Sequence, residues 1–82
     1  MKPEVWDQLK NKTADELIGA LKRDGWILRE SSGSSRQIYI KGQRLVSIHY
    51  HSHKTYDPKT LRYLINEVGW NEQGLRRLKL IK

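Results

Sequence analysis

Apolar residues recur with helical spacing in two stretches of the chain. The first stretch, at positions i, i+3, i+4 and i+7, contains Ala14, Leu17, Ile18 and Leu21. Such spacing places the four side chains on one face of a helix. Thr13 and Glu16 form a capping-box pattern, in which each side chain can accept a hydrogen bond from the other residue's backbone N–H. The pattern predicts a helix that starts after Thr13 and stops at Gly25.

The second helical stretch carries its apolar stripe at Leu61, Leu64, Ile65 and Val68. Asp57 is a favourable N-cap residue, Pro58 fits the first helical position, and Gly69 is a natural stop. Short helical extensions are predicted over residues 3–10 and 71–81.

Between the helices, residues 26–30, 37–41 and 45–51 are predicted strands, and apolar and polar residues alternate with the period of a strand in the second and third of them. Gly42 and Gln43 suit a tight hairpin turn. We expect one sheet face to be in the core, formed by Ile38, Ile40, Val46, Ile48 and Tyr50. We expect the other, open face to carry Tyr39, Ser47, His49 and His51.

These elements predict an α+β fold with the order αβββα: a three-stranded antiparallel sheet with both helices on one face, plus short terminal helices. The 82 residues are enough for one domain and not for two. We therefore predict a single domain over residues 1–82, with its core in 13–70 and the extensions at 3–10 and 71–81.

Positive charge is concentrated in the second part of the chain. The net charge is +7, and residues 36–82 supply all of it, since residues 1–35 contain equal numbers of basic and acidic side chains. Such asymmetry favours a polyanionic partner, either nucleic acid or an acidic protein surface. The alternative is a solubilising surface of a small basic protein.

The composition also bears on location and redox chemistry. The chain has no cysteine, so a disulfide or a thiolate metal site is excluded. Neither a signal peptide nor a membrane-spanning apolar run is present in the sequence. We predict a cytoplasmic protein with no membrane partner.

Over residues 14–70, several motifs resemble those of the HicA (YcfA-like) toxin family in their order and spacing. The matching segments are Glu16-Leu17-Ile18, Leu21-Lys22-Arg23-Asp24-Gly25-Trp26, Gly33-Ser34, Gly42-Gln43-Arg44, His51, Lys54, Pro58-Lys59-Thr60-Leu61 and Val68-Gly69. The resemblance implies a double-stranded-RNA-binding-domain-like fold. It also implies an mRNA interferase that cleaves mRNA without metal or other cofactor and is neutralised by a HicB-like antitoxin.

The chain departs from the family at the residue that the resemblance makes catalytic. A histidine is expected after Gly33-Ser34, and this sequence has Ser35. A serine hydroxyl does not titrate near neutral pH, whereas imidazole does and can act as general acid or base. Either nuclease activity is weak or absent, or His51 or His49 has taken over the role. A non-enzymatic module that binds RNA or an acidic protein is the alternative.

For RNA binding, the predicted contacts are Arg36, Lys54, Lys59 and Arg62, with Tyr39 stacking on a base. Lys54, Lys59 and Arg62 lie at or beside a predicted helix start, where the N-terminal N–H groups also attract phosphate. For any one of them the alternative is a solvated surface charge. Tyr56 and Trp70 could also stack on bases, although we prefer core packing against the last helix for Trp70.

The His-x-His-x-His pattern at residues 49–53 raises a third possibility, a metal site. On a straight strand the outer two residues would lie about 13 Å apart, at roughly 3.3 Å per residue. One metal ion could bind all three only if the strand bent. The remaining interpretation is three polar side chains on an open sheet face, and we predict no metal ligands.

Overall fold

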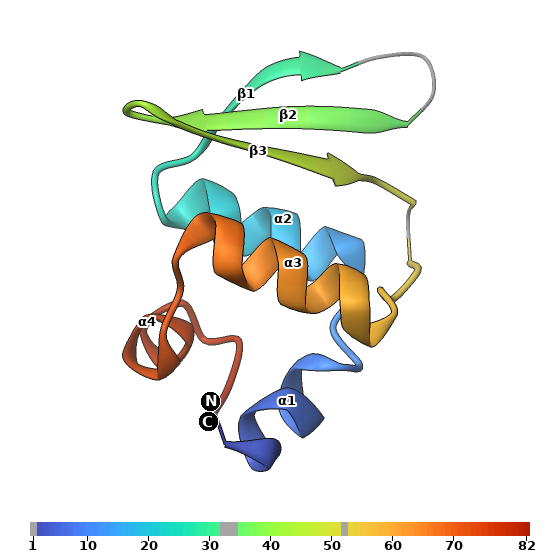
Figure 1. The fold of residues 1–82 in the computed structure, drawn as a ribbon, viewed down its shortest axis with the longest axis vertical. Helices are drawn as coiled ribbons and strands as arrows, with labels where there is room; N and C mark the ends of the chain where they lie inside the picture. Colours follow the sequence, from blue (N-terminus) through green and yellow to red (C-terminus); the bar gives the residue numbers. More distant parts are fainter. Residues whose placement is uncertain (1, 32–34, 52) are drawn as a thin grey trace.

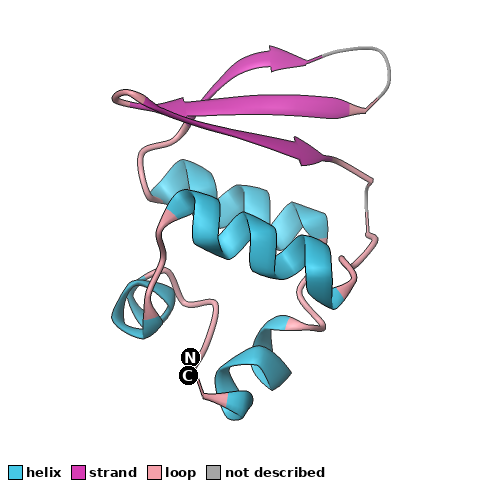
Figure 2. Cartoon of the chain, viewed as in Figure 1, coloured by secondary structure: helices cyan, strands magenta, loops and turns pink. Residues whose placement is uncertain are grey.

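The computed structural model describes residues 2–31, 35–51 and 53–82 as a three-stranded sheet with helices on one side (Figure 1). The elements, in chain order, are α1 (Pro3–Leu9), α2 (Ala14–Arg23), β1 (Ile27–Ser31), β2 (Arg36–Lys41), β3 (Arg44–His49), α3 (Pro58–Val68) and α4 (Glu72–Arg77). The sheet is antiparallel with the strand order β1-β2-β3. Helices α2 and α3 both cover the same sheet face, which confirms the predicted α+β fold class (Figure 2).

Helix α2 starts where its capping box predicts. The Thr13 hydroxyl accepts from the Glu16 backbone N–H at 3.3 Å, and the Glu16 carboxylate accepts from the Thr13 backbone N–H at 3.2 Å. The α2 side chains Leu17 and Leu21 are fully buried beneath the sheet. The helix start is therefore specified locally, while burial of the apolar stripe fixes which side faces the sheet.

Helix α3 is also bounded as predicted. Pro58 occupies its first turn, and Gly69 ends it with a left-handed φ of 74°. The predicted stripe is buried against the sheet and α2, and comprises Leu61, Leu64, Ile65 and Val68.

The predicted face of β2 is wrong. Tyr39 pairs with Val46 across the β2–β3 ladder, and both are buried, at 1% and 0% exposure. Ile38 and Ile40 instead lie on the open face, opposite Ser47 and Leu45. The predicted turn at residues 42–43 already requires this register, because a two-residue turn aligns position 39 with 46, and aligned residues share a face. The faces predicted for Val46 and Ser47 are correct.

The terminal extensions form a third layer on the side of α2 and α3 that faces away from the sheet (Figure 1). Its buried side chains are Val5, Leu9, Leu75, Leu78, Leu80 and Ile81. The backbone N–H of Lys82 donates to the Gln8 side-chain oxygen at 2.7 Å, so the two extensions meet. Helices α2 and α3 are therefore covered on two sides.

No helix in the described part of the chain is both long enough and apolar enough to cross a membrane.

Candidate functional site

Ser35, where the resemblance implied a catalytic histidine, lies immediately before β2. It is exposed and has a left-handed φ of 70°. Its carbonyl oxygen accepts a hydrogen bond from the Tyr50 backbone N–H at 2.8 Å, which ties it to the end of β3. The preceding Gly33 and Ser34 lie outside the described residues.

One strand position further on, Arg36 and His49 are direct cross-strand partners. Paired residues have Cβ atoms about 4.5–5.5 Å apart on the same sheet face. The Arg36 guanidinium also donates to the Ser47 hydroxyl at 2.8 Å, so it is held over β3. The structure thus gathers Ser35, Arg36 and His49 at one end of the sheet, with Arg36 and His49 on its open face.

The other two histidines, His51 and His53, lie in the exposed connection between β3 and α3. The His53 backbone N–H donates to the Asp15 carboxylate at 2.9 Å, and its imidazole Nδ1 lies 3.9 Å from the same oxygen. The Tyr50 hydroxyl donates to the other Asp15 oxygen. Sequence reasoning missed Asp15, which belongs to α2 and has no motif of its own.

No three histidine, aspartate or glutamate side chains converge as metal ligands within residues 2–31, 35–51 and 53–82. All three histidines belong to these ranges. The geometry therefore offers no support for the metal alternative.

A groove of about 340 Å³ runs between β3 and α3 beside this end of the sheet. Its lining residues are Ser47, Ile48, His49, Tyr56, Lys59, Thr60, Tyr63 and Leu64. The Tyr56 hydroxyl donates to the His49 carbonyl oxygen. Burial raises the pKa of Tyr56 to about 12, so this hydroxyl is a neutral donor.

The groove contains two of the predicted site residues, His49 and Lys59, and one that was missed, Tyr63. The Tyr63 side chain is 49% exposed, unusually high for a large aromatic ring. Its position four residues after Lys59 places the two on one helix face, and this spacing could have identified it.

Two other residues that were predicted to bind RNA, Arg62 and Lys54, do not line this groove. The Arg62 guanidinium stacks over the Trp6 ring of α1, 5.4 Å from its centre. Lys54 is exposed, and its carbonyl oxygen caps the start of α2 by accepting from the Ala14 N–H at 2.8 Å.

The assignment of Tyr39 to base stacking needs correction. Its ring is 1% exposed, and its hydroxyl donates to the Gln37 side chain at 2.7 Å. No ring face is accessible to a base, because Tyr39 points toward the helices instead of the open face.

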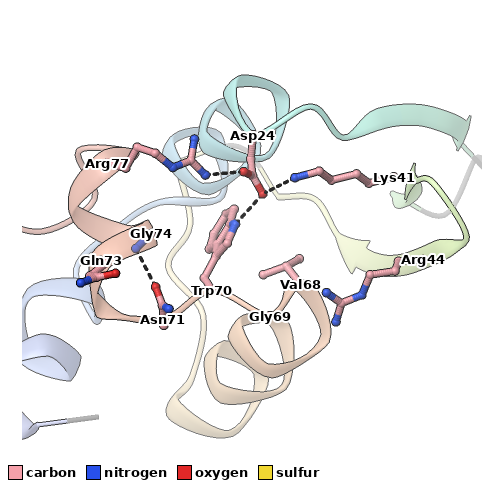
Figure 3. A pocket seen from close by; sticks show the side chains of 10 residues that line it. All are labelled: Asp24, Lys41, Arg44, Val68, Gly69, Trp70, Asn71, Gln73, Gly74 and Arg77. Atoms are coloured by element: carbon pink, nitrogen blue, oxygen red, sulfur yellow. Dashed lines mark hydrogen bonds and ion pairs between the residues drawn. The ribbon is translucent and has the colours of Figure 1, made fainter.

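A second cavity, of about 460 Å³, surrounds Asp24 at the other end of α3 (Figure 3). The Asp24 carboxylate, whose side chain is 7% exposed, accepts from Arg77 at 2.6 Å and from the Trp70 indole at 2.8 Å. It also accepts from the Trp26 indole at 3.2 Å, and the Lys41 ammonium lies 3.3 Å away.

This network keeps Asp24 ionised. Burial disfavours the charged carboxylate, but the hydrogen bonds from Trp70 and Arg77 and the charge of Lys41 outweigh burial and lower the pKa to about 2. Since the carboxylate ties the end of α2 to Trp70 and Arg77, we interpret this cavity as the anchor of the C-terminal extension.

A family model described as the HicA toxin of bacterial toxin-antitoxin systems matches residues 14–70. Searches of curated proteins and of solved structures return no significant match.

Proposed function

Because the chain belongs to the HicA toxin family of bacterial toxin–antitoxin systems, we propose that it binds RNA at the Ser35 end of its sheet and is neutralised by a HicB-like antitoxin protein. The observation that carries the RNA proposal is the grouping of Arg36, His49 and Lys59 around that end of the sheet. The family assignment supports the antitoxin, and the net charge of +7 favours an acidic surface on it.

Cleavage is a separate part of the proposal. In the proposed transesterification the ribose 2′-oxygen bonds to phosphorus and the bond from phosphorus to the 5′-oxygen breaks. The 2′-OH must lose a proton and the leaving oxygen must gain one, and Ser35 cannot transfer protons near neutral pH. His49 is the better-placed replacement on the sheet, because it pairs with Arg36, whose guanidinium would attract the scissile phosphate. His51 is the second candidate, two residues further along the chain. The reaction requires no metal.

A non-enzymatic RNA-binding module on the same surface is the second candidate function. The observation that favours it is Ser35 itself, since the hydroxyl leaves the family's catalytic position without a titrating group. Binding and cleavage therefore need separate tests.

Binding is tested by measuring RNA affinity against salt concentration. Removing one phosphate-binding side chain should lower the magnitude of the log–log salt slope by roughly 0.7–0.9. Lys59→Ala should do so, whereas Lys22→Ala at the exposed end of α2 serves as control. Binding that is absent at low salt, or independent of salt, would contradict the proposal.

Cleavage is tested with wild type, Ser35→His, His49→Ala and His51→Ala, each with and without chelator. If a histidine has replaced Ser35, wild type is active and the corresponding alanine variant loses about 10²–10⁴-fold in rate. If none has, wild type is nearly inactive and Ser35→His gains activity. If wild type and Ser35→His are both inactive, the result favours the non-enzymatic RNA-binding module. Loss of activity on chelation, restored by zinc, would contradict the metal-independent mechanism.

A further inference from the structure

We propose that the groove between β3 and α3 is a subsite for one nucleotide of single-stranded RNA, with the base against Tyr63 and the phosphate beside Lys59. The inference rests on the proposed RNA binding and deepens it, because it assigns a specific subsite and a strandedness to the RNA.

The aromatic character of the groove is the first reason. Tyr63 contributes a ring that is half exposed, and Tyr56 contributes a second ring that is more deeply buried. Stacking on an aromatic ring is the common way in which proteins hold unpaired bases. The volume of about 340 Å³ is near the lower end of the roughly 300–1,000 Å³ of small-ligand sites, as suits one base with part of its sugar.

The second reason is the free edge of β3, which is the last strand of the sheet. In an antiparallel ladder the backbone groups of successive residues point alternately toward and away from the partner strand. The Tyr50 N–H points toward β2, where it donates to Ser35, so His49 and Ser47 direct their backbone groups into the groove. The Tyr56 hydroxyl donates a hydrogen bond to the His49 carbonyl oxygen, which agrees with a carbonyl that points away from β2 and into the groove.

The strand edge therefore offers N–H donors of Ser47 and His49 and the carbonyl acceptor of Ser47. Such a mixture of donors and an acceptor complements the Watson–Crick edge of a base, which is exposed only when the base is unpaired. A duplex would have to unstack and open before a base could enter.

Charge is the third reason. Lys59, in the first turn of α3, is the cation of the groove, and none of the eight lining residues is a carboxylate. The Asp24 cavity differs in this respect, because two of its three basic residues, Lys41 and Arg77, already pair with a carboxylate. The Lys59 ammonium, with no carboxylate in the groove lining and with Tyr63 nearby, suits the phosphate of a nucleotide. An extended peptide added to the β3 edge is the competing occupant.

The subsite adjoins the candidate catalytic residues. His49 lines the groove and pairs with Arg36, the residue next to Ser35, and neighbouring strands lie about 4.8 Å apart. A nucleotide held in the groove would thus position the adjoining phosphate near Arg36 and Ser35.

The experiment is an amide NMR titration of the full chain with the four nucleoside 5′-monophosphates, followed by RNA-binding measurements on variants. We expect chemical-shift changes in residues 47–49 and 59–64. Tyr63→Leu should weaken single-stranded RNA binding roughly 5- to 150-fold, the range expected when one base loses its stacking partner. Tyr63→Phe should bind like wild type, and Lys22→Ala, of equal charge change to Lys59→Ala, should leave the monophosphate shifts unchanged.

Several outcomes distinguish failure of the nucleotide subsite from failure of the proposed RNA-binding function. If RNA binds with salt dependence but Tyr63→Leu, with a well-dispersed spectrum, binds like wild type, the subsite is wrong and the proposed function stands. Shifts confined to other residues, no shifts at the solubility limit of the nucleotides, or shifts in the groove caused by an extended peptide alone would also overturn the subsite. Failure of wild type to bind any RNA would overturn the proposed function itself.

Discussion

Replacing Asp24 with asparagine tests whether one buried carboxylate anchors the C-terminal extension. The carboxylate is 7% exposed and accepts hydrogen bonds from Arg77, Trp70 and Trp26 (Figure 3). An asparagine side chain would keep one acceptor oxygen but would direct an amide N–H₂ group toward donors and remove the charge that Lys41 and Arg77 face. We therefore expect Asp24→Asn to destabilise the fold.

The pKa of Asp24 sets the expected loss in the free energy of unfolding. In the folded protein it is about 2, against an ordinary value of 3.8. At roughly 1.4 kcal/mol per pKa unit, this gap corresponds to about 2 kcal/mol. Because the folded pKa is the lower one, the stabilisation is complete above pH 3.8 and is lost as the pH falls toward 2. For a domain of this size, about 2 kcal/mol lowers the midpoint of thermal unfolding by roughly 8–16 °C.

The assay is urea unfolding of wild type and Asp24→Asn at a series of pH values between 7 and 2. The free-energy difference should be about 2 kcal/mol at pH 7 and should shrink across the acid range, since only wild type titrates at this position. Asp7→Asn is the matched control, because Asp7 is 71% exposed and its pair with Lys10 is on the surface. A difference that is absent at pH 7, or that stays constant down to pH 2, would refute the reasoning.

Three further predictions test the fold. Thr13→Ala removes the capping box of α2 and should cost about 1 kcal/mol, seen as a melting midpoint roughly 4–8 °C lower; an unchanged midpoint would contradict the cap. Tyr39→Ala should cost roughly 3–5 kcal/mol in denaturant unfolding because the ring is buried, whereas a stable variant with weaker RNA binding would restore the stacking role. Gly69→Asn should destabilise slightly more than Gly42→Asn: both glycines have a positive φ that Asn tolerates, but a Cβ at Gly69 would meet the flexible Arg44 guanidinium at 2.7 Å and displace it from its hydrogen bond to the Glu67 carbonyl oxygen, whereas a Cβ at Gly42 would meet nothing within 4 Å. Equal melting midpoints would contradict that contact.

Local signals predicted the helices well, because each boundary has its own chemistry. The capping box at Thr13 and the left-handed glycine at Gly69 act within a few residues of the chain. Alternation alone could not assign the face of β2, since isoleucines and a tyrosine compete for the core and a one-residue choice reverses both faces. Only the turn register decides in favour of Tyr39.

The site was less predictable because it joins distant parts of the chain. The pairing of Arg36 with His49 follows from the same turn register, and both residues were named from the sequence. In contrast, Asp15 reaches Tyr50 and His53 from α2, across 35 and 38 residues, and no periodicity encodes that contact. Arg62 looked like a phosphate ligand, but the position of α1 turns it toward Trp6.

The contact between the two terminal extensions affects the order of folding during synthesis. Gln8 and Lys82 are separated by 74 residues, so α1 is translated long before the segment that covers it. At roughly 5–20 residues per second, the interval is about 4–15 s. During that time Val5 and Leu9 lack the partners Leu80 and Ile81 that share their buried cluster. The third layer over α2 and α3 can therefore close only after the last residues of this segment have been synthesised.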